Sequence, residues 1–180
     1  MRELIEKNTL KILKILGIFW GLILAVYFGN PSNTDTYDPR ARVLGFMFFH
    51  IPSASMYPTV EKDSYIFVST FSYIFSSLNS WEMVVYRPPH ADSPFLGRVM
   101  GKSGDIISVS NSSVTLNGTE LDEDYINDEV LICQFSEFTE TTIPEGYLFV
   151  LGDNRCNSLD SRSFGFIPKS SIIGKVTASF

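Results

Sequence analysis

The feature that most constrains this chain is a long apolar segment close to its N-terminus. Residues Leu10–Phe28 are almost entirely hydrophobic, and Lys11 and Lys14 are the charges near its start. Long lysine side chains can reach the headgroups, so a helix of this length can still cross a bilayer core of about 30 Å. No polar face repeats along the segment, which disfavours a buried helix of a soluble domain. We therefore expect a membrane-spanning helix.

The charges around this segment predict its orientation. Basic residues precede or open it, whereas residues 29–37 contain no Lys or Arg. The positive-inside rule then places the N-terminus in the cytoplasm and the rest of the chain across the membrane. A cleavable secretory signal is the alternative, but no small-x-small cleavage site follows Phe28 at a suitable distance. An uncleaved anchor is the favoured interpretation.

The remainder of the chain has the pattern of a β domain. Pro, Ser, Asn, Asp and Thr dominate the stretch after the anchor, which indicates a linker. From Val43 onward, short apolar runs alternate with Gly, Pro and Asn. We expect an anchor over 1–29, a linker over 30–42 and a mainly β domain over 43–180. The predicted strands are Tyr65–Thr70, Met83–Tyr86, Leu96–Met100, Ile106–Ser110, Val114–Leu116 and Tyr147–Leu151.

Two short segments carry more specific expectations. Asn117-Gly118 lies between two strand-like runs, and both residue types tolerate the positive φ of a tight hairpin. Phe46–Phe49 is unusually apolar for a domain boundary. It is either a buried strand or a β surface that lies against the bilayer beside the anchor.

Composition excludes several functions. The net charge is −6 and no basic run follows the first helix, so nucleic-acid binding is disfavoured. The acidic stretch Glu120–Asp128 is typical of a solvated loop. Cys133 and Cys156 are the two cysteines, and their spacing fits no zinc site. They could form a disulfide in an oxidising compartment, which the sequence leaves open. We expect no metal and no cofactor.

The residues with the clearest chemical potential lie just after the linker. Ser53 and Ser55 occupy a turn bracketed by Pro52 and Pro58. A serine hydroxyl is a weak nucleophile at neutral pH and needs an adjacent base. A rigid turn can present such a hydroxyl and aim N–H groups at a developing oxyanion. A serine-rich turn alone is more often only a turn.

The turn does not stand alone, because several segments together resemble the bacterial type I signal peptidases (leader peptidases). Ile51–Thr59 resembles that family's PS-x-SM-x-PT string, which follows the membrane anchor. Leu96–Asp105 resembles its KRV-x-G-x-x-GD segment. Gly152–Arg162, followed by Gly165–Pro168, resembles its GDNR-x-NS-x-DSR segment. Trp81–Tyr86 matches more weakly a strand that begins with GD. The resemblance covers essentially the whole chain, anchor included.

The resemblance implies a role for each matching residue. Ser55 would be the nucleophile, and Ser53 with the Ser55 backbone N–H would line the oxyanion hole. Ser158 would orient the base through a hydrogen bond, and Asp153 would pair with Arg98. Alternatively, the charged residues only form salt bridges within a loop, and the family itself implies such a supporting role in part. Further support would come from Met56, Arg155, Asp160 and Arg162.

One departure from the family pattern bears directly on activity. The family's general base is a lysine immediately before the Arg-Val pair, and Gly97 occupies that position. Lys102 is five residues further on, an offset that points to the opposite face of a strand. His90 and His50 are alternative bases, since eukaryotic relatives use histidine, and a water held by Ser158 is another. A smaller departure is Cys156, where the family commonly has Asp.

Two functions of different class follow from these residues. The first is a membrane-bound serine endopeptidase that removes signal peptides after small-x-small sites, with the substrate added as a strand. The second is a catalytically silent homologue that binds secreted or pilin-like chains and assists assembly. The intact serine turn favours the first, and Gly97 favours the second. The resemblance implies a signal-peptidase-like β-sheet or barrel domain, anchored by one span in the bacterial inner membrane. Its soluble part would lie on the periplasmic or extracellular side.

Overall fold

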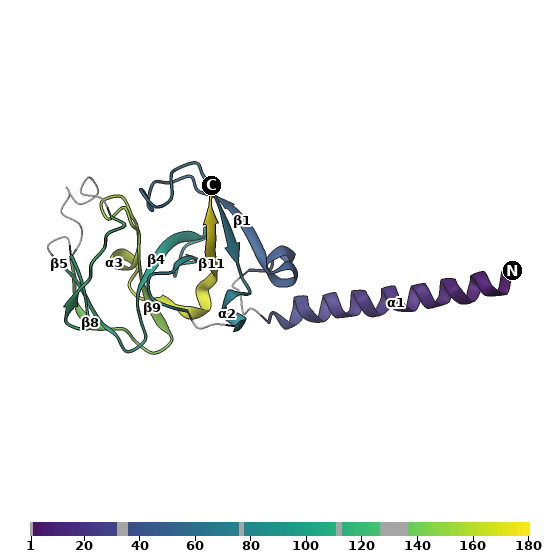
Figure 1. Cartoon of the computed structure of the whole chain (residues 1–180). Helices are drawn as coiled ribbons and strands as arrows, with labels where there is room; N and C mark the ends of the chain where they lie inside the picture. The colour runs from purple at the N-terminus through teal and green to yellow at the C-terminus, as the bar shows by residue number, and fades with distance from the viewer. Residues whose placement is uncertain (1, 32–35, 76–77, 111–112, 127–136) are drawn as a thin grey trace.

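The chain forms a long N-terminal helix that extends away from a β domain (Figure 1). The computed structural model describes all residues except 1, 32–35, 76–77, 111–112 and 127–136. Two antiparallel sheets make up the described part of the domain. A mainly β fold behind an apolar helix is what the sequence predicts.

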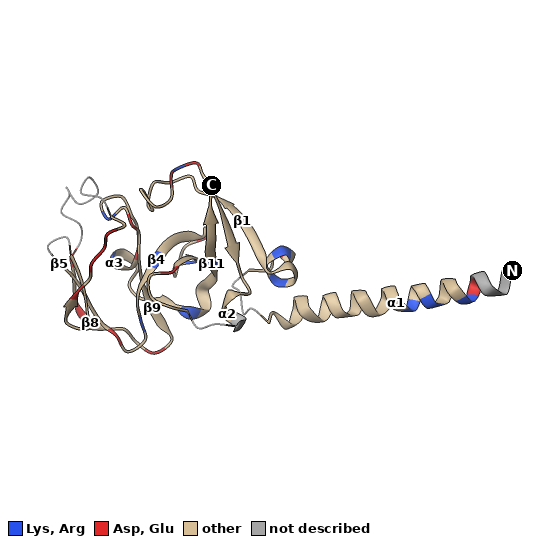
Figure 2. Ribbon diagram, in the orientation of Figure 1, with Lys and Arg blue, Asp and Glu red and all other residues tan. Residues whose placement is uncertain are grey.

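The N-terminal helix is α1, Arg2–Gly29. From residue 6 to residue 29 it is long and apolar enough to cross a membrane. Its charged residues gather toward the N-terminal end, and the rest of the helix carries none (Figure 2). Side chains such as Leu16, Phe19 and Leu22 are exposed, because the β domain does not cover the helix. A helix that is apolar on every side is typical of a membrane span.

A short helical turn joins the anchor to the domain. This turn, η1, spans Arg40–Leu44 and is π-helical. Ala41 is fully buried in the domain core. The Arg42 guanidinium is also buried, with its central carbon 4.3 Å from the ring centroid of Tyr37 and 5.6 Å from that of Tyr27. The end of the expected linker therefore packs on the domain, and the division into three parts stays a prediction.

The larger sheet positions the residues of interest. Its strand order is β1-β2-β11-β3-β4-β9-β10, and neighbouring strands run antiparallel. β4 pairs with β9, which leads directly into the predicted loop 152–162. The short helices α2 and α3 and the 3-10 turn η3 connect some of these strands. The elements are β1 Phe46–His50, β2 Tyr65–Ser69, α2 Ser72–Phe75, β3 Met83–Tyr86, β4 Phe95–Lys102, β9 Tyr147–Leu151, α3 Ser161–Phe164, β10 Ile167–Pro168, η3 Lys169–Ser171 and β11 Ile172–Ser179.

The smaller sheet has the order β7-β6-β5-β8. Its strands are β5 Ile106–Ser110, β6 Ser113–Leu116, β7 Thr119–Glu120 and β8 Phe138–Thr142. Asn117 and Gly118 join β6 to β7 with φ values of 52° and 78°, which confirms the predicted hairpin. Met100, Ile107 and Phe149 share one buried cluster, so apolar packing joins this sheet to β4 and β9.

Each predicted strand is present, with small shifts at its ends. Phe46–Phe49 forms most of β1, and only one of its faces is buried. Met47 lies in the core, whereas 51% of Phe48 is exposed. Phe46 and Phe48 contact the ring of Phe67, and Phe48 also contacts Phe180, so aromatic side chains cover the outer face.

Candidate active site

Buried apolar residues of the serine turn hold it against the core of the domain. Met56 and Val60 are buried, and the Val60 N–H donates to the Met56 carbonyl. The side chain of Met56 thereby packs under the turn, near the predicted nucleophile. Ser55 stays partly exposed, and its Oγ lies 3.2 Å from the Oγ of Ser53. The two predicted hydroxyls are therefore neighbours on the rim of the domain.

The loop after β9 is hydrogen-bonded to this turn. The Asn154 N–H donates to the Ser55 carbonyl at 3.0 Å, and the Asn154 side chain donates to the Ala54 carbonyl. The Asp153 N–H points to the Met56 sulfur at 3.4 Å. The two segments are about a hundred positions apart in the sequence, and these bonds fix the position of Ser55 relative to the loop.

Asp153 is also the centre of a buried ion pair. Its carboxylate accepts from Arg98 Nε at 2.9 Å and Arg98 Nη2 at 2.6 Å, which is the predicted pairing. The Thr59 hydroxyl donates to the same carboxylate at 2.6 Å. Burial lowers the pKa of Arg98, but the bonds and charge of Asp153 outweigh it, so the net shift is upward. β4 is thereby tied to the serine turn one residue beyond Gly97.

A second ion pair shapes the far end of the loop. Arg162 donates to both carboxylate oxygens of Asp160, at 2.8 and 2.7 Å. Asp160 also accepts from the Gly152 N–H at 3.1 Å and caps α3. A Cβ at position 152 would lie 2.1 Å from Ser158 Oγ and 2.7 Å from the Ser55 carbonyl oxygen. Only glycine fits there, and it lets Ser158 lie close to the serine turn.

Arg155 reveals residues that the sequence reasoning missed. Its side chain is fully buried, donates to the Gly152 carbonyl and pairs with Glu123. The Tyr125 hydroxyl donates to Glu123, and its ring lies under the Arg98 guanidinium, 4.1 Å from its centroid. The interpretation of 120–128 as a solvated face is therefore wrong at Glu123. No local pattern distinguishes this glutamate from its acidic neighbours.

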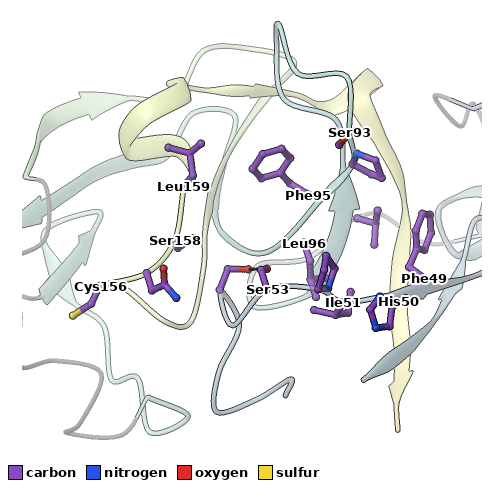
Figure 3. Close-up of a pocket in the computed structure, with 15 residues that line it drawn as sticks. Phe49, His50, Ile51, Ser53, Ser93, Phe95, Leu96, Cys156, Ser158 and Leu159 are labelled. Carbon is purple, nitrogen blue, oxygen red and sulfur yellow. Dashed lines mark hydrogen bonds between the residues drawn. The ribbon is translucent and has the colours of Figure 1, made fainter. Parts of the chain in front are cut away.

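An apolar groove opens beside the two serines and encloses about 570 Å³. Figure 3 shows the loop residues Cys156, Ser158 and Leu159 on one side and Leu96 and Phe95 of β4 on the other. Ser53, Ser55 and the end of β1 line the same groove, and Val85 of β3 also contributes. The three sequence motifs thus meet around one cavity.

Gly97 is buried in β4, and the space beside it is filled. A Cβ built there would lie 2.6 Å from Val150 Cγ1, 3.1 Å from the Leu151 carbonyl oxygen and 3.3 Å from the Tyr86 ring. Tyr86 Oη is buried and has no hydrogen-bond partner among the described residues. Burial, and then the charge of Asp160, raise the pKa of the Tyr86 phenol well above its usual value. Neither Gly97 nor Tyr86 is among the described residues that line the groove.

The other residues considered as substitute bases lie in different places. His50 lines the groove. His90 is exposed in the loop before β4, and Lys102 is exposed at the far end of β4, and neither is among the described groove residues. Cys156 is disulfide-bonded, and Cys133 lies outside the described residues. Within the described part of the chain, no cluster of three or more His, Cys, Asp or Glu residues is arranged to hold a metal ion.

The chain belongs to the family described as "Signal peptidase, peptidase S26", which matches residues 40–180. The matched region contains the serine turn, β4 and the loop after β9. It begins at η1, so the anchor lies outside it.

Individual relatives agree with this assignment. Signal peptidase I of Bacillus caldolyticus is 34% identical over 145 residues, covering 75% of this chain and 79% of that protein. Signal peptidase I of Leptolyngbya laminosa is 32% identical over 139 residues, covering 73% of this chain and 66% of that protein, so the match spans just under two thirds of its length. The crystal structure of a signal peptidase I from Enterococcus faecalis V583 superposes with a TM-score of 0.52 at 29% identity. That superposition covers 57% of this chain and 98% of the other.

Proposed function

We propose that this chain is a membrane-bound serine endopeptidase that removes signal peptides from exported proteins after small-x-small sites. The observation that carries the proposal is the partly exposed Ser55 hydroxyl, 3.2 Å from the Ser53 hydroxyl at the edge of an apolar groove. A binding protein has no chemical need for a nucleophile held in this way. Membership of the signal peptidase family supports the same reaction class.

Each site residue has a role in this proposal. Ser55 attacks the scissile carbonyl, and Ser53 together with the Ser55 N–H stabilises the oxyanion. Ser158 stands where a base would be oriented, and Gly97 stands where the family has its lysine. The other supporting residues act by holding the loop and turn in register, and they are Met56, Arg98, Asp153, Arg155, Asp160 and Arg162.

The groove suits an extended peptide with small side chains. Val85, Leu96 and Ile51 give it an apolar lining close to Ser55. An extended substrate pairs its backbone with a strand edge and places alternate side chains into the groove. We propose that this apolar lining receives the small residues next to the scissile bond.

The location that we propose is the bacterial inner membrane, with one span over 1–29 and the domain of 43–180 on the periplasmic or extracellular side. Lys7, Lys11 and Lys14 at the start of α1 would remain cytoplasmic. The aromatic face formed by Phe46, Phe48, Phe67 and Phe180 would rest against the bilayer surface. The groove would then receive preproteins as they leave the membrane.

The close packing beside Gly97 favours a second function. A catalytically silent homologue would use the same groove to bind secreted or pilin-like chains and assist assembly. A Cβ at position 97 would lie 2.6 Å from Val150 Cγ1 and 3.3 Å from the Tyr86 ring, so a lysine there would require these neighbours to shift. Binding would then persist without hydrolysis.

A cleavage assay on the purified full-length protein separates the two functions. We expect the wild type to process a preprotein and Ser55→Ala to lower the rate by on the order of 10⁴-fold. Ser113→Ala, on the smaller sheet, is the matched control and should retain the wild-type rate. An inert wild type that still binds the preprotein would support the silent homologue. In that case Gly97→Lys combined with Val150→Ala, which makes room for the side chain, should introduce cleavage.

A further inference from the structure

Two buried arginines hold the backbone that lies against Ser55. Arg155 Nε donates to the Gly152 carbonyl at 3.1 Å. Arg98 binds the carboxylate of the next residue, Asp153, at 2.9 and 2.6 Å. A Cβ at position 152 would lie 2.7 Å from the Ser55 carbonyl oxygen, so this backbone is in direct contact with the serine turn. Groups that fix the two guanidinium groups therefore also fix the support of Ser55.

Glu123 provides the charge that Arg155 requires. The Arg155 side chain is fully buried, and 11% of the Glu123 side chain is exposed. Both oxygens of Glu123 accept from this guanidinium, and the bond from Nη1 to Oε2 measures 2.9 Å. Among the described residues, Glu123 is the acidic group that pairs with Arg155. A bidentate pair fixes the plane of a guanidinium, and without it the buried cation would be strongly unfavourable.

Tyr125 connects this pair to the second arginine. Its hydroxyl donates to Glu123 and accepts from Arg155 Nη2 at 3.5 Å. Its ring centroid lies 4.1 Å from the central carbon of Arg98, where the aromatic face attracts the cation. Burial, and then the charge of Glu123, raise the pKa of the Tyr125 phenol well above its usual value, so the phenol keeps the proton that it donates. One short segment therefore contacts both arginines.

The backbone between the two arginine contacts carries the bonds to the serine turn. The Asn154 N–H donates to the Ser55 carbonyl at 3.0 Å, and the Asp153 N–H points to the Met56 sulfur at 3.4 Å. A shift of this backbone would move the Ser55 hydroxyl relative to the groove. A misplacement of about 1 Å can lower a reaction rate by about 10²-fold, even when its cause is distant from the reacting atoms.

Resting on the proposed endopeptidase function, we propose that Glu123 and Tyr125 are positioning residues for the nucleophile Ser55. Glu123 acts through Arg155, and Tyr125 acts through Arg98. Neither is among the described residues that line the groove, so neither contacts the peptide there. The pair holds the loop after β9 at the distance that places the Ser55 hydroxyl for attack.

The first test measures kcat and KM for the full-length protein in detergent with a preprotein substrate. Glu123→Gln keeps the shape of the side chain and removes its charge. We expect it to lower kcat by about 10- to 100-fold with little change in KM, because the groove lining is unaltered. Tyr125→Leu should also lower kcat, and Tyr125→Phe should recover most of that loss because it keeps the ring over Arg98.

Two control variants separate positioning from loss of charge or of stability. Asp124→Asn removes an exposed charge between the two residues and should keep the wild-type kcat. Val114→Ala removes buried apolar volume from β6 and should lower the free energy of unfolding without lowering kcat under conditions in which it is folded. A kcat that falls as far in either control as in Glu123→Gln would overturn the positioning role.

Amide hydrogen exchange measures the positioning without relying on cleavage. We expect the Asn154 N–H, which donates to Ser55, to exchange about tenfold faster in Glu123→Gln than in Val114→Ala, because only the first variant releases the loop locally. If Ser55→Ala abolishes cleavage but Glu123→Gln keeps the wild-type kcat, the positioning role is overturned and the endopeptidase stands. An inert wild type with fast exchange only in Glu123→Gln overturns the endopeptidase and upholds the positioning of Ser55.

Discussion

The serine turn and the part of β4 around Gly97 are held in place by different interactions. On the serine side, polar bonds join the turn to the loop after β9, through Asn154, Asp153 and Thr59. On the β4 side, Gly97 is surrounded by the side chains of Val150 and Tyr86. The first side is a hydrogen-bond network and the second is close apolar packing.

This difference explains how a missing side chain leaves the rest of the site intact. The bonds that position Ser55 run through Arg98, the neighbour of Gly97, and do not use a side chain at 97. Arg98 and Gly97 point to opposite faces of β4 because side chains alternate along a strand. Ser55, the proposed nucleophile, and position 97 are therefore stabilised by different contacts, and one can change without the other.

The largest stability effect should come from the polar side. Asp153→Ala leaves the buried Arg98 without its partner, and we expect a loss of about 3–5 kcal/mol in the free energy of unfolding. Asp38→Ala removes the exposed pair with Arg40 and should cost under about 1 kcal/mol. Denaturant titration of both variants measures the contrast. Equal losses would show that the Asp153 pair is no more than a surface contact.

An intermediate effect is expected on the packed side. Gly97→Ala places a methyl group 2.6 Å from Val150 Cγ1, and such overpacking costs about 1–3 kcal/mol. Val150→Ala should destabilise the protein alone but less in the presence of Gly97→Ala, because the new methyl group uses the vacated space. A double-mutant cycle measures this coupling. Additive losses would mean that the two residues do not share the space.

The smallest effect concerns the ion pair between Glu82, just before β3, and Lys175 of β11. Burial raises the pKa of Glu82, but bonds from Lys175 and Asn79 outweigh it, so the net pKa lies below the usual value. A lowered carboxyl pKa adds stability above the unfolded-state value of about 4.3, and that stability is lost as the pH falls through the folded-state value. Glu82→Gln should therefore cost under about 1 kcal/mol at pH 7 and nothing in strong acid. A penalty for Glu82→Gln that stays constant from neutral to strongly acidic pH would contradict the account.

Much of the fold follows from local patterns. Alternating or continuous apolar runs predicted β3, β5 and β9, and Asn117-Gly118 predicted its hairpin, because turn chemistry and strand periodicity are properties of neighbouring residues. β8 was not predicted, since Phe138–Thr142 is mostly polar and exposed. β11 was not predicted either, because Gly174 and small residues interrupt its apolar pattern.

The candidate site could likewise be predicted only in part from the sequence. The resemblance led to Ser55, Asp153 and Arg98, and the structure brings them together. Glu123 could not be found, because its importance depends on a buried arginine that is distant in sequence. The sequence also could not show that the space beside Gly97 is filled, because Val150, which fills it, lies on the neighbouring strand β9.

The central claim is that Ser55 forms a covalent bond with the substrate although β4 carries no base at 97. Rapid acid quenching of the full-length protein with a preprotein, followed by mass spectrometry of its peptides, tests this directly. We predict an acyl group on Ser55 in the wild type, absent from Ser55→Ala. Cleavage without any acyl group on Ser55, or an acyl group on another residue, would contradict the account.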